Sequence, residues 1–518
     1  MEAVDFKVNS TKMDYVILTI NKLYTMEKTT TSGINRRNFL KSAALGAVGL
    51  TILPSWKSSG VGAAPSDTIY MGSIGLGRQC LSDFSSHTSC RGVNMIAGAD
   101  VHSLKRVRFQ NRVTAWQKSK GLREACDLYE DYRYILDRTD IDAIEIASPD
   151  HWHALQTIHA AEAGKDIYCQ KPLSYTIRES QEMVKAVRNN NVVLQVGSQQ
   201  RSQATFQKAI ELVQAGKIGH ITTIKSKVGD PPKPLAVLLD PSNTAPNLMK
   251  KDPPPELNWN LWLGPLNDPS IFYFDDICPP ISLNPVSNES AWGAWRWYSE
   301  TGNGYPADWG AHMFDIAQAA IGMDGLGPVE VTPPGYNGAK FTTFKYENGI
   351  IMTEEDYTSG VNPTAQGIRF DGTDGWITVS RSHISCSDQS LIPAEIAGTP
   401  PSPPMSAEER AAAMAARQAQ QAQARTQAAQ RGGPGDVQYE VSSPHSQDFM
   451  DAIRERKDPI APVEVGCSSN ITCVLSNIAM ELGRTIRWNP ATERFVNDPE
   501  AQAHRLVDYA YRKPYKLY

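Results

Sequence analysis

The sequence lacks an excess of basic residues and lacks closely spaced cysteines, and each absence excludes a class of protein. The 518 residues include 51 Lys and Arg and 56 Asp and Glu, which gives a formal net charge of −5. Binding nucleic acid through its phosphates needs a basic face, so no nucleic acid is expected among the partners. The eight cysteines include no C-x-x-C pair. This spacing argues against a zinc site or a redox dithiol and predicts mostly buried thiols.

The chain also lacks the biased composition of a disordered, collagenous or disulfide-rich protein. Hydrophobic residues make up 41% of it and charged residues 21%, which is typical of globular domains. At about 150 residues per domain, the length predicts roughly two to four domains with sizeable cores.

The apolar run near the N-terminus is too short to span a membrane. It extends from Ala43 to Leu53, follows the twin arginine Arg36-Arg37 and precedes small residues at 61–64. This order is typical of a twin-arginine export signal, a route that carries folded proteins; a short buried helix is the alternative. We therefore expect residues 1–64 to be a leader with an upstream extension. The mature protein is then expected to be periplasmic, without stable insertion in the membrane.

After the leader, apolar runs alternate with segments of helical periodicity. Strands are expected at 68–74, 93–99, 143–147, 166–169 and 192–196, with helices from about 78 and over 104–118, 153–163 and 177–189. This alternation is the signature of a doubly wound parallel sheet. We therefore predict an α/β fold whose first part, residues 66–199, is a Rossmann-type domain.

The turn after the first predicted strand has the chemistry of a dinucleotide site. Gly75, Leu76 and Gly77 let the backbone approach a pyrophosphate, and the helix start at Arg78 offers free N–H groups and a positive dipole end. Asp100, at the end of the second strand, would bond an adenosine ribose and repel a 2′-phosphate, which favours NAD over NADP. The fingerprint is incomplete, because Cys80 occupies the third small-residue position.

Two short motifs carry a resemblance to a known family. The segments Ser148-Pro-Asp-His-Trp-His153 and Tyr168-Cys-Gln-Lys-Pro-Leu173 resemble those of the Gfo/Idh/MocA oxidoreductases, which include glucose–fructose oxidoreductase and inositol dehydrogenases. The likeness extends over most of 67–518, through residues 292–297, 308–315, 459–464 and 495–499. It implies that residues 200–518 form a second α/β domain built on a large, mostly antiparallel sheet. In the family this sheet often joins subunits, so the resemblance implies a homodimer or homotetramer.

The resemblance also implies which residues face the nicotinamide half of the cofactor. They are Ser148, Asp150, His151, Trp152, His153, Gln170 and Lys171. The segment 148–153 can equally be a helix start with Asp150 as its N-cap, and a zinc site at the two histidines lacks a third ligand nearby. Gln170 departs from the Glu-Lys-Pro of the family and removes a charge beside Lys171.

Oxidation of a secondary alcohol needs a base for the hydroxyl proton while the carbon passes a hydride to nicotinamide. His312 is the expected base, and Asp308, four residues earlier, would share its face of a helix. By resemblance, Asp308 contacts the sugar or steadies the base, and Lys171 bonds the same oxygen. The alternatives are a solvated turn lysine and a helix-surface pair. Arg296, in the Trp-rich stretch, and Tyr305 are expected to contact the sugar unless that stretch is core.

Two segments interrupt the pattern of the second domain. Residues 230–290 are rich in Pro and Asn and predict a long ordered loop over the site. Residues 398–436 have low complexity, which predicts a solvated insertion or arm, with a partner-binding helix as the alternative.

Together these features predict an exported, NAD-dependent oxidoreductase that acts on a secondary hydroxyl of a sugar or glycoside, with no metal. The net charge favours a neutral sugar. Because an exported enzyme has no soluble nicotinamide pool, we expect tightly held cofactor. One alternative is an NAD-dependent glycoside hydrolase that uses transient C3 oxidation and elimination. Another is a catalytically silent sugar-binding protein that retains NAD.

Overall fold

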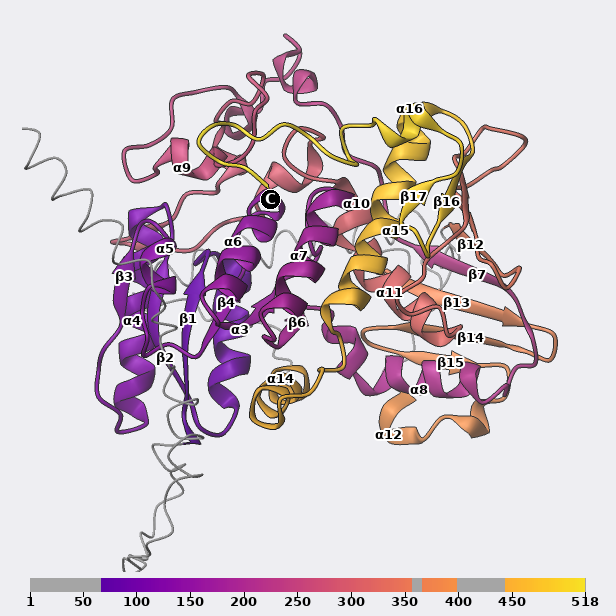
Figure 1. Cartoon of the computed structure of the whole chain (residues 1–518), viewed down its shortest axis with the longest axis horizontal. Coiled ribbons are helices and arrows are strands. Elements are labelled where there is room, and N and C mark those ends of the chain that lie inside the picture. The colour runs from indigo at the N-terminus through magenta and orange to yellow at the C-terminus, as the bar shows by residue number, and fades with distance from the viewer. Residues whose placement is uncertain (1–66, 356–365, 398–442, 518) are drawn as a thin grey trace, which may run out of the picture. The chain divides into compact units, whose positions relative to one another are not determined.

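The computed structural model describes residues 67–355, 366–397 and 443–517 (Figure 1). The predicted leader, residues 1–64, and the predicted insertion, residues 398–436, lie outside the described residues. Within the described ranges, no helix combines the length and the apolar character needed to cross a membrane.

The first domain is built on a six-stranded parallel sheet with the strand order β3-β2-β1-β4-β5-β6. The strands are β1 (Ile69–Ile74), β2 (Val93–Ala99), β3 (Asp127–Tyr129), β4 (Ala143–Ile146), β5 (Asp166–Cys169) and β6 (Leu194–Val196). The helices are α3 (Arg78–Ser89), α4 (Ser103–Ser119), α5 (Arg133–Leu136), α6 (Asp150–Glu162) and α7 (Ile177–Asn189). The predicted doubly wound sheet is confirmed; β3 and α5 were not predicted.

Local sequence explains where α7 begins. Thr176 accepts a hydrogen bond from the Glu179 backbone N–H through its hydroxyl, and the Glu179 carboxylate accepts one from the Thr176 backbone N–H at 2.9 Å. This reciprocal pair satisfies two N–H groups that a helix start otherwise leaves unpaired. It fixes the helix directly after the Lys171 turn.

The second part of the chain carries the large sheet that the resemblance implied. Its nine strands have the order β15-β14-β13-β7-β12-β11-β10-β16-β17, and all pairs are antiparallel except β7 with β12. The strands are β7 (Ile221–Lys227), β10 (Glu330–Thr332), β11 (Thr343–Lys345), β12 (Ile351–Glu354), β13 (Gly367–Gly372), β14 (Trp376–Ser380), β15 (Ile384–Cys386), β16 (Ile486–Asn489) and β17 (Arg494–Phe495).

Helices join the two sheets into one core. The long helix α15 (Val463–Leu482) packs against α7 of the first domain and against α11 (Gly310–Ala320) (Figure 1). One hydrophobic cluster contains Ile146 and Leu194 of the first sheet together with Phe344 and Ile368 of the second. The remaining helices of this part are α8 (Ala204–Gln214), α10 (Gly304–Asp308), α12 (Ala394–Ala397), α14 (Ser443–Glu455) and α16 (Pro499–Gln502).

A long segment between β7 and β10 of the second sheet lies against the first domain, and we call residues 250–297 the covering segment. It contains α9 (Trp259–Leu263), the hairpin β8 (Ser282–Leu283) and β9 (Val286–Ser287), and short 3₁₀ turns. Its aromatic residues form a separate hydrophobic cluster. Asn258 donates from its backbone to Val101 at 2.9 Å, and Ser103 donates to Glu256 at 2.8 Å, so the segment is tied to the end of β2. The predicted loop, residues 230–290, contains only short elements, and most of it belongs to this segment.

The eight cysteines are all buried free thiols, which confirms the prediction made from their spacing. Among the residues that the structure describes, no three His, Cys, Asp or Glu side chains gather as metal ligands.

Candidate active site

A cavity lies at the turn between β1 and α3, and we call it the glycine-turn cavity. Gly75 has a φ of +82°, and a Cβ there would lie 2.5 Å from the backbone nitrogen of Ser148, so only glycine fits. Gly77 precedes α3 and provides no capping side chain. The first N–H groups of α3 therefore have no capping side chain from residue 77, as a phosphate-binding helix start requires. Arg78 lines the cavity beside them.

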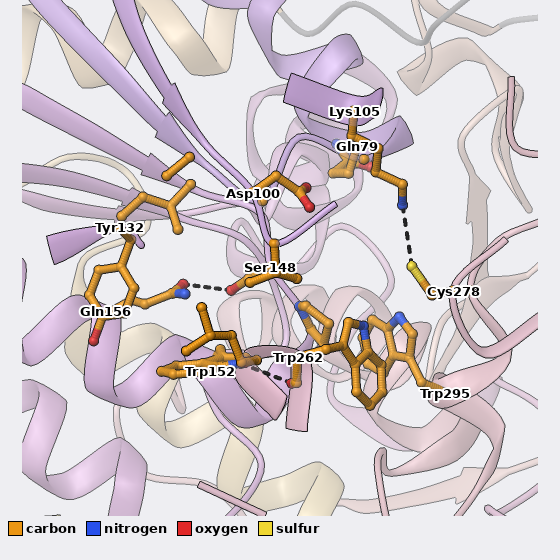
Figure 2. A pocket seen from close by; sticks show the side chains of 18 of the residues that line it. Gln79, Asp100, Lys105, Tyr132, Ser148, Trp152, Gln156, Trp262, Cys278 and Trp295 are labelled. Atoms are coloured by element: carbon orange, nitrogen blue, oxygen red, sulfur yellow. Dashed lines mark hydrogen bonds between the residues drawn. The ribbon is translucent and has the colours of Figure 1, made fainter. Parts of the chain in front are cut away.

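Asp100 is held at the end of β2 and lines the same cavity (Figure 2). Its carboxylate accepts from the backbone N–H of Leu76 at 2.7 Å and from that of His102 at 2.8 Å. These bonds fix the carboxylate beside the glycine turn. The side chain of Leu76 is fully buried in the core, so this residue takes part in the turn through its backbone alone.

The turn after β4 places its side chains in three different roles. Pro149 is the N-cap of α6, so the prediction that Asp150 caps this helix is wrong by one residue. Trp152 lines the glycine-turn cavity and donates from its indole N–H to the carbonyls of the covering segment (Figure 2). His153 bonds the Ser148 and Pro172 carbonyls at 2.9 and 2.8 Å and so joins this turn to the Lys171 turn.

His151 lines neither the glycine-turn cavity nor the neighbouring cavity around Lys171, which corrects its predicted cofactor contact. Its ring nitrogen Nε2 lies 2.9 Å from the Trp262 carbonyl, and the two rings pack 5.2 Å apart. Burial lowers its pKa to about 4, so the ring is neutral at pH 7. The side chain therefore anchors the covering segment.

An ion pair fixes the covering segment over the glycine turn. Glu289 is buried and lies 2.6 Å from Arg108 and 3.3 Å from Lys105, both on α4. Burial alone would raise its pKa, but the two cations outweigh this and lower it to about 2. Arg108 also donates to the Leu76 carbonyl at 2.7 Å. The contact thus links the segment directly to the turn.

A second cavity, which we call the Lys171 cavity, adjoins the first. Both are lined by Arg78, Gln79, Ser148, Trp292, Trp295 and Arg296, so they share part of their wall. Within the Lys171 cavity, the Lys171 ammonium donates to the side chain of Asp308 at 2.8 Å and to its carbonyl at 2.7 Å. Burial raises the pKa of Asp308, but Lys171 and Arg296 more than offset this and the net shift is downward. Asp308 is therefore ionised at neutral pH.

Asp308 and His312 do not share one helix face, contrary to the prediction. Asp308 is the last residue of α10, His312 lies in the first turn of α11, and the chain passes from one helix to the other at Trp309. Lys171, from the first domain, is the partner of the carboxylate. The three residues predicted as catalytic therefore line one cavity, and the contact among them is between Lys171 and Asp308.

His312 has partners that no sequence motif indicated. Gln200, after β6, and Arg381, after β14, both lie against its ring. Burial first, and then the positive charges of Lys171 and Arg381, lower the pKa of His312 well below its usual value. The histidine is therefore neutral at pH 7. Neither Gln200 nor Arg381 belongs to a sequence motif. They become neighbours of His312 only in the folded chain.

Aromatic rings and guanidinium groups form the wall of the Lys171 cavity. Trp292 has the guanidinium of Arg78 over its ring at 4.7 Å and that of Arg296 at 5.3 Å. Tyr305 stacks on Trp297 at 4.3 Å. Arg296 and Tyr305 both line the cavity.

Gln170 lies in a group of buried carboxyls, which explains its departure from glutamate. Its amide donates to Asp83 at 2.7 Å, and Gln79 donates to the same carboxyl at 2.9 Å. Burial raises the pKa of Asp83 to about 7 and that of the neighbouring Glu145 well above its usual value. A glutamate at 170 would place a third carboxyl here and remove a donor.

We expect Gln170→Glu to destabilise the protein by about 1–3 kcal/mol at pH 8, because a lost donor leaves two carboxyls facing each other. The loss should be smaller at pH 6, where one of them is protonated. Thermal unfolding at both pH values measures this. The double variant Asp83→Asn/Gln170→Glu should recover most of the loss. Equal melting temperatures for Gln170→Glu and the unchanged chain at pH 8 would contradict this account.

Two family models match separate parts of the chain. Residues 72–198 match the oxidoreductase family, NAD-binding Rossmann fold, and residues 437–517 match the oxidoreductase family, C-terminal alpha/beta domain. Both models are of the Gfo/Idh/MocA family, and both matches support the resemblance found in the motifs.

Curated relatives match part of the chain. A levoglucosan dehydrogenase of Pseudarthrobacter phenanthrenivorans is 40% identical over 20% of this chain and 28% of its own length. A glycosyl hydrolase family 109 protein of Shewanella baltica is 30% identical over 29% of this chain and 36% of its own length. The chain thus spans well under two thirds of the length of these relatives.

A solved structure of levoglucosan dehydrogenase, in complex with NADH and L-sorbose, matches the fold. The TM-score is 0.50 at 18% sequence identity, over 81% of this chain and 98% of that one. At this identity the likeness concerns the fold alone.

Proposed function

We propose, on the premise that the chain carries the two domains of the Gfo/Idh/MocA oxidoreductases, that it is an NAD-dependent oxidoreductase of sugars. It would transfer a hydride between nicotinamide and a secondary hydroxyl of a sugar or glycoside. The observation that carries this proposal is that the glycine-turn cavity adjoins the cavity that holds Lys171, Asp308 and His312 and shares lining residues with it.

The glycine-turn cavity fits a dinucleotide. The tight turn that Gly75 allows, the start of α3 and the fixed Asp100 carboxylate suit a pyrophosphate and a ribose. Asp100 favours NAD over NADP because it repels a 2′-phosphate. When bound, the nicotinamide supplies or accepts the hydride.

The Lys171 cavity supplies the groups that a reacting secondary alcohol needs. Lys171 and His312 both line it, and Asp308 holds the ammonium in place at 2.8 Å. We expect these side chains to bond the oxygen whose proton is exchanged during hydride transfer. Arg296 and Tyr305 would contact the rest of the ring. Burial raises the pKa of Asp150 to about 8, so this lining residue adds no negative charge at neutral pH.

The covering segment supports the proposal that the cofactor is tightly held. Full-length protein purified without added nucleotide is expected to carry close to one dinucleotide per chain. Denaturation, chromatography and mass spectrometry of the released ligand measure this and identify NAD or NADP. Protein that lacks dinucleotide and binds NAD with micromolar or weaker affinity would contradict it. A retained cofactor would be recycled by a second substrate or by keto-sugar exchange.

A second candidate function is NAD-dependent glycoside hydrolysis, favoured by the similarity to a glycosyl hydrolase family 109 protein. In that reaction, transient oxidation at C3 would acidify the C2 proton and allow elimination of the aglycone. Incubation of NAD-loaded protein with aryl glycosides separates the two functions. Release of the aglycone without accumulation of NADH would favour the hydrolase, and NADH formation from a free sugar would favour the dehydrogenase.

Export and assembly are further parts of the proposal. The twin arginine at 36–37 supports transport to the periplasm, and replacement of both residues by lysine should keep the protein in the cytoplasm. The large sheet supports a homodimer or homotetramer, which light scattering on the purified chain measures.

A further inference from the structure

The two nitrogens of the His312 ring meet different neighbours. Its Nδ1 faces the side-chain amide of Gln200, which is fully buried, and its Nε2 lies 3.5 Å from the Arg381 guanidinium. The nitrogen and oxygen of an amide occupy equivalent positions, so its orientation follows from the groups around it. The hydrogen bonds of Gln200 therefore decide which ring nitrogen carries the proton.

Arg381 fixes the orientation of the amide. With the Gln200 oxygen toward Arg381, it accepts from the Nε and Nη2 groups of the guanidinium at 2.8 Å each. The opposite orientation would set two N–H donors against the amide N–H₂ at the same distances. Two bonds to a charged donor outweigh the 3.5 Å contact at His312 Nε2, which is at the limit for a hydrogen bond.

This orientation assigns the imidazole proton. The Gln200 N–H₂ donates to His312 Nδ1 at 2.5 Å, so Nδ1 must present its lone pair. A neutral imidazole has one N–H, and here it is at Nε2. Protonation of both nitrogens is disfavoured by burial, by Lys171 and Arg381, by the nearby His445 and by the positive end of α11, with Asp308 already paired to Lys171.

We propose that Gln200 and Arg381 are positioning residues that hold His312 as its neutral Nε2–H tautomer. In this form His312 donates a hydrogen bond to the reacting oxygen and does not accept its proton. This differs from the base that the sequence predicts. The inference rests on the proposed function only for its catalytic consequence, since the tautomer is a property of the folded chain.

Proton transfer then belongs to Lys171. In the direction of reduction, a bound reduced nicotinamide would supply the hydride to the carbonyl carbon, and the Lys171 ammonium would give a proton to the carbonyl oxygen. A C–H and an O–H bond form, the C=O double bond becomes single, and the neutral amine regains a proton from solvent. His312 Nε2–H stabilises the negative charge that develops on the oxygen meanwhile. Oxidation is the reverse.

The test is ¹⁵N NMR of the full chain labelled at histidine, with His312 identified by the signal lost in His312→Gln. The expected result is a protonated Nε2 and an unprotonated Nδ1 at pH 7. In Gln200→Glu the carboxylate accepts from the ring, so the proton should move to Nδ1 and the pKa of His312 should rise by about one unit or more. Gln207→Glu, on α8, adds the same charge away from the cavity and should leave the ring signals unchanged.

Turnover gives the second measurement. Gln200→Glu should lower kcat about 100-fold, since the donor to the oxygen is lost, with cofactor content unchanged. A proton found on Nδ1 in the unchanged chain, or one that stays on Nε2 in Gln200→Glu, would overturn the inference. If Gln200→Glu does not fold, Gln200→Met should give a mixture of both tautomers, and a single Nε2–H form there would overturn the role of Gln200. Absence of hydride transfer by NAD-loaded protein would instead count against the proposed function.

Discussion

Lys171→Met is expected to lower turnover about 1,000-fold or more while leaving the bound dinucleotide in place. The ammonium is the group in the cavity that both pairs with Asp308 at 2.8 Å and can give a proton to the reacting oxygen. Methionine keeps the length and the apolar stem of the side chain but has no charge and no donor. Steady-state turnover of a sugar substrate, with cofactor content measured on the same sample, checks this.

Two comparisons make that result specific. Lys185→Met, at an exposed position on α7, removes an ammonium paired to Glu182 and should change turnover less than twofold. Asp308→Asn leaves Lys171 without its carboxylate, so it should reduce turnover by a smaller factor. Turnover of Lys171→Met within threefold of the unchanged protein would show that the reaction does not use this side chain.

Glu289→Ala is expected to destabilise the protein by about 3–5 kcal/mol and to release the dinucleotide. The substitution leaves Lys105 and Arg108 largely buried without the carboxylate that now lies 3.3 and 2.6 Å away. It also cuts the link between the covering segment and the glycine turn. Chemical denaturation and nucleotide content measure the two effects. Glu211→Ala, which removes an exposed partner of Lys208, should change stability by less than 1 kcal/mol.

The same ion pair predicts a loss of stability in acid. The pKa of Glu289 is lowered from 4.5 to about 2 in the folded chain. A carboxyl with a depressed pKa contributes its full stabilisation above its unfolded value and loses it as the pH falls toward the folded value. The contribution of about 3 kcal/mol should therefore disappear between pH 4.5 and 2. In Glu289→Ala this part of the pH dependence should be absent; an unchanged acid transition would contradict the assignment.

Sequence periodicity predicted the first domain well because its strands are buried on both faces. The runs at 93–99, 166–169 and 177–189 match β2, β5 and α7 residue for residue. The strand β3, three residues at Asp127–Tyr129, has no apolar run, because it lies at the edge of the sheet and is partly exposed. Because β3 lies at the edge of the sheet, it lacks the run of apolar residues from which the other strands were predicted.

The site was predictable only where neighbours in sequence remain neighbours in space. The glycine turn and the Lys171 turn are such cases. The contact of Asp308 depends on a helix break at Trp309 that spacing cannot reveal. Gln200 and Arg381 meet His312 from two different parts of the chain. The cluster of buried carboxyls around Asp83 and Gln170 likewise forms only when the fold brings Asp83 of α3 beside Gln170, which follows β5. The sequence alone therefore gives no reason for glutamine at position 170 in place of the glutamate of the family motif.

The hydrophobic cluster that runs through both sheets limits how a ligand can leave the glycine-turn cavity. Opening the molecule by separating its two halves would expose that core and would cost much of the folding free energy. Detachment of the covering segment leaves that cluster intact and breaks the segment's own contacts: backbone hydrogen bonds to the end of β2, the bonds of His151 and Trp152, and the Glu289 contact. The residence time of a bound dinucleotide then equals the time for which the covering segment stays attached to α4. It does not depend on a hinge motion between the two domains.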